Sequence, residues 1–114
     1  MGLPWVRLDT QFASNPKLLE LTAAGRWRSA FVYVAGLAYA GAHGTDGYIG
    51  ESSLPFMHAT KREAKELVAA GLWHTDVGGW QINGWDEFQI SDDAAKDRRE
   101  RARNAAMKRW GTNA

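Results

Sequence analysis

Seven basic residues lie within fourteen positions near the C-terminus of the 114-residue chain. They are Lys96, Arg98, Arg99, Arg101, Arg103, Lys108 and Arg109. Cations at this density neutralise phosphate groups, which gives an affinity for nucleic acid that falls as salt rises. Trp110 follows them and can stack on a base. The alternatives for this segment are a solvated helix, a disordered tail or a dimerising helix.

A second set of residues with suitable chemistry lies on the helix that the sequence predicts over Thr60–Ala70. At about 100° per residue, its inward side carries Ala64, Leu67 and Val68. Its outward side carries Arg62, Lys65 and Ala69, with Glu66 beside them and Lys61 at the flank. Long cations on such a face reach phosphates and guanine edges in a major groove, and a small alanine permits close approach. A solvated amphipathic face is the alternative.

Residues for catalysis or metal binding do not form a recognisable set. The histidines His43, His58 and His74 have no companion ligands at the spacing of a metal site. Asp86-Glu87 and Asp92-Asp93 are adjacent in sequence, so the two carboxylates of each pair diverge. The glycines that follow residue 40 do not lie between a strand and a helix, as a phosphate-binding loop requires. We therefore expect no enzyme, no cofactor and no metal ion.

Charge is distributed unevenly along a chain whose formal net charge is only +1. Residues 1–90 contain seven Lys/Arg against nine Asp/Glu, a net charge of −2. Residues 91–114 contain seven Lys/Arg against four Asp/Glu, a net charge of +3. The length suits one domain. We therefore predict a folded body over 1–90 and a basic helix or tail over 91–114.

The sequence also bears on compartment. It has no cysteine, which fits a reducing environment. The N-terminus lacks a basic segment followed by an apolar run, so we expect no signal peptide. The most apolar stretch, Ala30–Ala42, is too short to cross a bilayer. These features predict a cytoplasmic protein without a membrane partner.

The N-terminal half predicts an arm and two helices. Trp5–Phe12 alternates loosely and is expected to dock its aromatic residues on the body. Asn15-Pro16 begins a helix as cap and first residue, and Gly25 ends it. The next helix is expected over about Arg26–Ala40. Apolar residues recur along it at helical spacing, and they are Trp27, Ala30, Phe31, Val34, Leu37 and Ala38. Val32, Tyr33 and Tyr39 add a second apolar side, so we expect a central helix with others packed around it.

The central stretch from Gly47 to Ile82 predicts a strand, two helices and a hairpin. Tyr48-Ile49 forms the strand, and Glu51–His58 forms a short helix with Leu54, Phe56 and Met57 in the core. Thr60-x-x-Glu63 is a capping box, and Gly71 closes that helix. The hairpin follows, with its turn at Asp76–Gly79 and no cation at the tip. We predict a mainly α winged helix-turn-helix with a small β-hairpin and a basic C-terminal helix.

Other predictions concern tryptophan and the C-terminal helix. At least four of the six tryptophans are expected to pack in or around the core. Trp85 and Phe88 are expected to tether the end of the body. The last helix has an inner face made only of alanine, which buries little area, so it is expected to dock weakly or to project. That face comprises Ala94, Ala95, Ala102, Ala105 and Ala106.

Several segments together resemble a known group of proteins. The first are WVRLDTxF (Trp5–Phe12), NPK (Asn15–Lys17), VYVAGLAYAG (Val32–Gly41) and GTDGYI (Gly44–Ile49). The others are AT-x3-A-x2-LV-x2-GLW (Ala59–Trp73), GGW-x-I-x2-W-x-E-x-Q (Gly78–Gln89) and KRW (Lys108–Trp110). Together they resemble small helix-turn-helix proteins of actinobacterial phages and prophages. More distantly, the body is similar to the N-terminal winged-helix domains of phage replisome organisers and DnaD-like proteins.

The resemblance implies DNA binding in phage replication or transcription control, inside the host-cell cytoplasm. Duplex DNA is accordingly the first partner to expect. A protein-interaction module that binds a host or phage protein is the alternative, favoured by the aromatic surplus. RNA or single-stranded DNA is a third candidate, through the arginines and Trp110. A homodimer is compatible with each of these.

Overall fold

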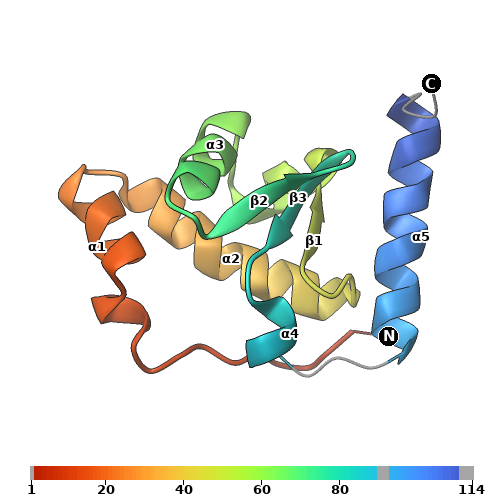
Figure 1. Cartoon of the computed structure of the whole chain (residues 1–114), viewed down its shortest axis with the longest axis horizontal. Coiled ribbons are helices and arrows are strands. Elements are labelled where there is room, and N and C mark those ends of the chain that lie inside the picture. The colour runs from red at the N-terminus through yellow and green to blue at the C-terminus, as the bar shows by residue number, and fades with distance from the viewer. Residues whose placement is uncertain (1, 90–92, 111–114) are drawn as a thin grey trace.

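The computed structural model describes residues 2–89 and 93–110, except for the side chains of Phe88, residues 93–99 and Trp110. Most of the described residues are helical, and three short strands form one antiparallel sheet (Figure 1). The elements are η1 (Phe12–Ser14), α1 (Pro16–Ala23), α2 (Trp27–His43), β1 (Tyr48–Gly50), η2 (Glu51–Met57), α3 (Lys61–Ala69), β2 (Trp73–Asp76), β3 (Gly79–Ile82), α4 (Trp85–Phe88) and α5 (Asp93–Trp110), where η denotes a 3-10 helix.

The sheet has the strand order β1-β3-β2, with β3 in the centre. The predicted hairpin is β2 and β3, joined by Val77 and Gly78, and Gly78 has the positive φ of 72° that its turn requires. The predicted strand β1 pairs with the far side of β3, where Ile49 lies opposite Trp80. A segment from the middle of the chain therefore completes the sheet.

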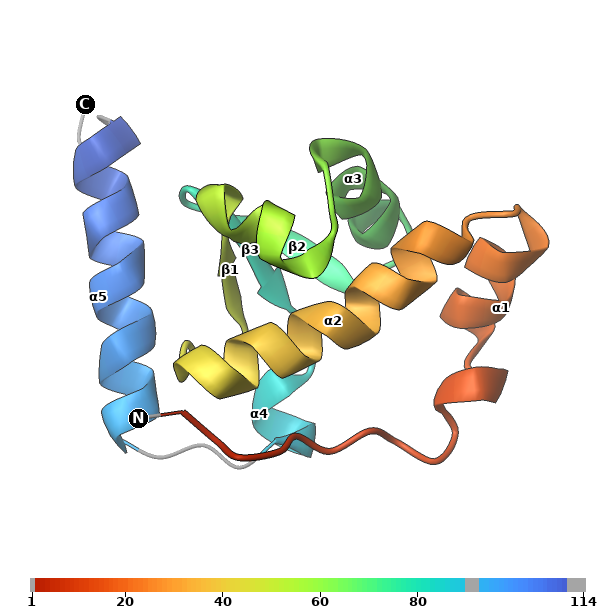
Figure 2. The same cartoon turned by 180° about the vertical axis from the view of Figure 1, so that it is seen from behind.

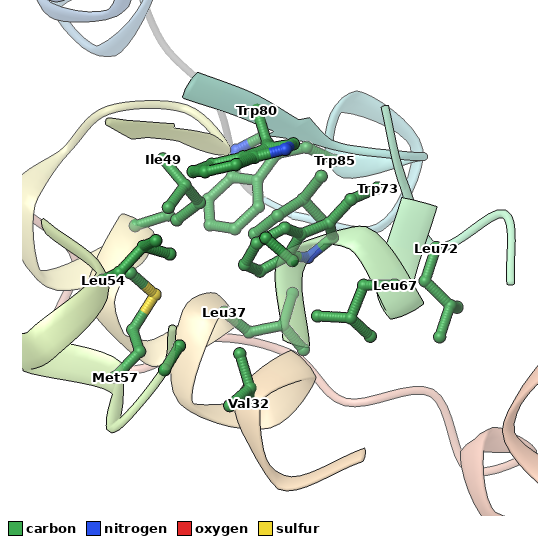
Figure 3. Packing of buried hydrophobic residues seen from close by; sticks show 14 of the residues in the cluster. Val32, Leu37, Ile49, Leu54, Met57, Leu67, Leu72, Trp73, Trp80 and Trp85 are labelled. Atoms are coloured by element: carbon green, nitrogen blue, oxygen red, sulfur yellow. The ribbon is translucent and has the colours of Figure 1, made fainter. Parts of the chain in front are cut away.

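The core lies between the sheet, α2 and α3 (Figure 3). Trp73, Trp80 and Trp85 are buried in it, whereas Trp5 and Trp27 are exposed. Three of the five tryptophans whose side chains are described therefore pack in the core; the side chain of Trp110 lies outside the description. Trp73 lies against Gly36 of α2, where an added Cβ would be only 3.0 Å from the indole Cζ2 atom.

The prediction that α2 is a central helix with others packed around it is wrong on one side. Trp27, Phe31, Val34 and Ala38 are exposed, whereas the buried residues of the helix are Ser29, Val32, Gly36, Leu37, Ala40 and Gly41. Of the first apolar side, Leu37 is buried and Ala30 is half-buried. Of the second, Val32 is buried, and Tyr33 and Tyr39 are half-buried. Apolar residues surround this helix, so two faces have helical spacing and periodicity alone does not select one. The face that fits against Trp73 and the sheet is the buried one.

Local signals at the helix ends are confirmed. The Asn15 side chain accepts a hydrogen bond from the Lys17 amide at 2.9 Å, and Gly25 has a φ of 76° after the end of α1. The segment Glu51–Met57, expected as a short helix, is a 3-10 helix. Pro55 lies inside it and has no N–H to donate to a longer α-helical ladder. Leu54 and Met57 are buried as predicted, but Phe56 is 73% exposed.

The N-terminal arm is held mainly through its backbone. The Leu3 amide donates to the Gly41 carbonyl at 2.8 Å. The Arg7 amide donates to Gln89 Oε1 at 2.8 Å, and Gln89 Nε2 donates to the Arg7 carbonyl at 2.7 Å. Phe12 stacks on Tyr33, with ring centroids 5.6 Å apart, as expected for a docked aromatic. Trp5 does not dock, because it is 59% exposed. The predicted tether through the Phe88 side chain lies outside the described residues.

Candidate nucleic-acid interface

The α3 helix is fixed at both ends by its own sequence. The Thr60 hydroxyl accepts from the Arg62 amide at 3.2 Å, and Glu63 accepts from the Thr60 amide at 2.7 Å. This is the predicted capping box. At the other end Gly71 has a φ of 82°, and the Leu72 amide donates to the Leu67 carbonyl at 3.0 Å. These bonds set where the outer face of α3 begins and ends.

The two faces of α3 lie as the sequence predicts. Ala64 and Leu67 are fully buried, and Val68 packs against the core. The four outer residues are exposed, namely Lys61, Arg62, Lys65 and Ala69. Lys61 is held by Glu51 of η2 at 2.8 Å, and Arg62 lies 3.4 Å from Glu66. The helix therefore presents three cations beside one small residue.

Glu66 lies beside the outer cations as expected, 3.4 Å from Arg62, but it is largely buried against α2. Its side chain is only 14% exposed and accepts from the Ser29 hydroxyl of α2 at 2.5 Å. That hydrogen bond and nearby Arg62 and Arg26 hold the pKa of Glu66 below its usual value, although burial acts to raise it. The carboxylate thus joins two helices while it stays paired with Arg62 of the outer face.

Glu63 is also buried, at the first turn of α3. Burial acts to raise the pKa of Glu63, but the Thr60 amide and hydroxyl and the Arg28 charge together lower it. Arg28 lies 3.9 Å from the carboxylate and donates to the His58 carbonyl at 3.0 and 3.1 Å. The same acid therefore caps α3 and draws a cation from α2 towards it.

Cations from three elements surround α3. Lys17 of α1 donates to the Gly71 carbonyl at 3.2 Å, and Arg26 at the start of α2 lies 3.9 Å from Glu66. Six of the seven Lys/Arg among residues 2–89 belong to this set, which we call the α3 basic surface: Lys17, Arg26, Arg28, Lys61, Arg62 and Lys65.

Four acids lie against this surface, and they are Glu20, Glu51, Glu63 and Glu66. Six cations and four acids leave a formal charge of +2 there, on a body whose total is −2. Lys17, Arg26 and Arg28 were missed from the sequence, because they are more than thirty residues from α3 and no local pattern connects them to it.

The hairpin tip carries an acid, as the sequence predicts, and α5 supplies a cation to it. The Nη2 and Nε atoms of Arg103 lie 2.9 and 3.1 Å from Asp76 Oδ2. Ala106 of α5 is buried, and α5 lies beside β1 in both views (Figures 1 and 2). The last helix is therefore docked on the sheet side of the body. Arg103 is paired within the protein.

The contact face of α5 differs in detail from the predicted alanine face. Ala106 is buried and Ala102 is half-buried as expected, but Ala105 is exposed. Met107, which is not part of the predicted alanine face, is half-buried. Ala94 and Ala95 lie in the part whose side chains are not described. The face therefore combines one thioether with small residues.

The predicted cations of the C-terminal segment fall into two groups. Arg101, Lys108 and Arg109 are exposed on α5. Burial and the Asp76 carboxylate raise the pKa of Tyr48, while Arg109 and Arg103 act to lower it. The side chains of Lys96, Arg98, Arg99 and Trp110 lie outside the described residues, so their predicted contacts remain predictions.

No alternative site chemistry stands out in the part of the chain that the structure describes. There, no group of three or more histidine, aspartate or glutamate side chains is arranged to hold a metal ion. His43 contacts the Tyr39 carbonyl and His74 contacts Asn83, each in its own local pair. Within the same residues, no helix is both long enough and apolar enough to span a membrane.

Comparison with protein-family models, curated proteins and solved structures produced no match. The features that bear on function are therefore the α3 basic surface and the docked α5.

Proposed function

We propose that this chain is a winged helix-turn-helix protein that binds duplex DNA through the outer face of α3. The order β1, η2, α3, β2, β3 and the strand order β1-β3-β2 fit such a fold. In helix-turn-helix proteins the second helix of the pair enters the major groove. The observation that carries the proposal is the concentration of six of the body's seven cations around that helix.

Each part of the surface has a role in this proposal. Arg62 and Lys65 lie on the outer face and reach base edges or phosphates in the groove. Ala69 keeps the C-terminal half of α3 thin enough for close approach. Lys17, Arg26 and Arg28 lie at the margins and contact phosphates on either side of the groove. Lys61 exchanges its bond to Glu51 for a phosphate when DNA is present.

The docked α5 replaces the cations that the hairpin lacks. DNA-binding wings commonly place Arg or Lys against the backbone or minor groove. Here the tip carries Asp76, which Arg103 neutralises at 2.9 Å. Lys108 and Arg109 then provide exposed positive charge on α5. α3, the hairpin turn and the C-terminal end of α5 lie towards the same edge in both views (Figures 1 and 2).

The biological setting that we propose is phage replication or transcription control in the host cytoplasm, on the resemblance given above. A protein-interaction module remains the second candidate, because Trp27, Phe31 and Phe56 form exposed apolar surface. That surface belongs to α2 and η2, whereas the DNA-binding proposal uses the outer face of α3. The two functions therefore make separate mutational predictions.

Titration of a fluorescent duplex by anisotropy at low and at physiological salt tests the DNA-binding function. The double variant Arg62→Ala/Lys65→Ala is expected to bind at least about tenfold more weakly, a loss of about 1.4 kcal/mol. Arg7→Ala is the matched control, because it removes an exposed cation from the N-terminal arm. The control should bind like the original chain.

The same titration with a single strand of equal length separates the alternatives. Duplex binding that depends on Arg62 and Lys65 supports the proposal. Absence of binding even at low salt, or equal losses for the α3 variant and Arg7→Ala, would refute it. Preference for the single strand would instead favour the stacking mode of Trp110 and the arginines.

A further inference from the structure

The outward side of α2 carries a regular apolar stripe. Trp27, Phe31 and Val34 are 67%, 55% and 37% exposed, and Ala38 is exposed after them. Their spacing of four, three and four residues is the one that two helices use when they pack lengthwise. Figure 2 shows the molecule from the side on which α2 crosses in front of the sheet.

Residues of η2 extend this stripe sideways. Phe56 is 73% exposed and stacks on Tyr39 of α2, with ring centroids 6.0 Å apart. The His58 ring lies 6.0 Å from that of Phe31. Of the seven large hydrophobic residues exposed in the described part of the chain, four lie here. A concentration of this kind marks an interaction surface more often than scattered single residues do.

We propose that this surface, which we call the α2 face, binds a second copy of the same chain with the two α2 helices antiparallel. The stripe has its largest residues at one end and its smallest at the other. Antiparallel pairing places Trp27 over Ala38 of the second copy, and Phe31 over Val34. Large side chains then fill the space left by small ones along the whole stripe.

Charge on the α2 face is compatible with self-association. Between Arg28 and His43 the helix contains no Lys, Arg, Asp or Glu, so two copies meet without like-charge repulsion. Antiparallel packing also brings the N-terminal end of each helix beside the C-terminal end of the other, which is the favourable arrangement of helix dipoles. A parallel pair would place Trp27 on Trp27 and Arg28 near Arg28.

The area available reaches the lower limit for a specific dimer. Aromatic side chains carry about 150–250 Å² each, so Trp27, Phe31 and Phe56 together expose about 400 Å² on one copy. Two copies contribute about 800 Å² from these rings alone. Val34, Ala38 and the rims of neighbouring residues raise the total to about 1,000 Å², the size at which specific interfaces begin.

Sedimentation equilibrium of the whole chain, without DNA, tests the proposal. The mass should rise from the 12.6 kDa of a monomer towards twice that value as concentration increases. The variant Phe31→Lys/Val34→Lys should remain a monomer over the same range. Leu19→Lys is the matched control, since Leu19 is 52% exposed on α1, outside the α2 face, and this variant should still dimerise.

Cysteine cross-linking tests the direction of the helices, because the chain has no native cysteine. A mixture of Trp27→Cys and Ala38→Cys chains should form a disulfide between the two variants on mild oxidation. Trp27→Cys alone should not, because antiparallel packing separates the two copies of position 27 beyond the reach of a disulfide.

Three outcomes would overturn the α2 face proposal. They are a monomer at all concentrations, a dimer unaffected by Phe31→Lys/Val34→Lys, and efficient cross-linking of Trp27→Cys to itself. None of these measurements involves DNA. If the dimer proposal is overturned, the proposed DNA-binding function is therefore unaffected. If DNA binding is absent, the dimer proposal is likewise unaffected.

Discussion

At the scale of single residues, Glu66 is largely buried, although a solvated helix face would leave it in water. It accepts from Ser29 and lies between Arg26 and Arg62. Its pKa is lower in the folded state than in the unfolded one. The folded protein therefore holds fewer protons at this site than the unfolded chain does. The ionised Glu66 carboxylate stabilises the fold above the ordinary pKa of 4.5, and this stabilisation is lost as the pH falls through the lowered pKa.

Glu66→Gln is expected to lower the free energy of unfolding by about 1 kcal/mol near neutral pH, because the bond from Ser29 loses its charged acceptor and the attraction to Arg26 and Arg62 is removed. The difference from the original chain should shrink as the pH falls below 4.5. Urea unfolding followed by tryptophan fluorescence at several pH values measures it. Glu87→Gln, at an exposed position on α4 away from α3, is the control, and a pH-independent difference for Glu66→Gln would contradict the explanation.

Thr60 is the second residue whose local role makes a testable prediction. Replacing the cap by alanine removes the hydroxyl that accepts from Arg62 and bonds Glu63. Thr60→Ala should lower the free energy of unfolding by about 1 kcal/mol. Thr10→Ala, at an exposed position in the arm, should change it by less than about 0.5 kcal/mol. Equal effects of the two in chemical denaturation would show that the capping box contributes nothing.

At the scale of elements, α3 contributes part of the salt dependence of DNA binding in our proposal. Each cation that contacts a phosphate contributes about one unit to the slope of log affinity against log salt. The variant Arg62→Ala/Lys65→Ala should therefore flatten that slope by about two units if both residues contact phosphates. Anisotropy titrations over a salt series measure the slope. An unchanged slope with weaker binding would mean that these residues read base edges alone.

Docking of α5 makes a second prediction at this scale. Ala106 is buried against the body and Ala105 beside it is exposed. Ala106→Asp should release α5, because an unpaired carboxylate is costly to bury, whereas Ala105→Asp adds the same charge and should leave α5 in place. Hydrogen exchange of α5 amides and duplex affinity are the measurements. If the two variants show the same hydrogen exchange and the same duplex affinity, the burial of Ala106 neither holds α5 in place nor affects DNA binding.

At the scale of the whole molecule, the two proposals combine into an arrangement on DNA. A two-fold axis between antiparallel helices runs perpendicular to them, in the plane of their interface. In Figures 1 and 2 the α3 edge lies above α2, along the direction of such an axis. A dimer through the α2 face would then present both α3 helices at the same edge, as binding to two half-sites requires.

The arrangement predicts two copies of the chain per duplex site and cooperative binding to inverted repeats. Phe31→Lys/Val34→Lys should bind the same duplexes more weakly and one copy at a time, although its α3 is intact. Stoichiometric titration with mass determination of the complex measures this. One copy per site for the original chain would refute the joint arrangement, even if both separate proposals held.

Features set by neighbouring residues were predictable from the sequence. Asn15-Pro16, Thr60 with Glu63, and Gly71 fix helix ends through bonds that span only a few positions, and all three are confirmed. The inward face of α3 was predictable for a related reason. Its apolar residues occupy one side only, so the helical period leaves a single choice for burial.

Features that depend on distant neighbours were decided by the tertiary structure. α2 has apolar residues on two sides, and packing against Trp73 and the sheet determined that Val32 is buried and Phe31 exposed. Cations from α1 and α2 reach α3 only because the chain folds back on itself. The sequence by itself determined local caps, turns and one-sided helices, whose energies come from adjacent residues. The choice of buried face and the gathering of charge depend on contacts between segments far apart in the chain, which only the fold creates.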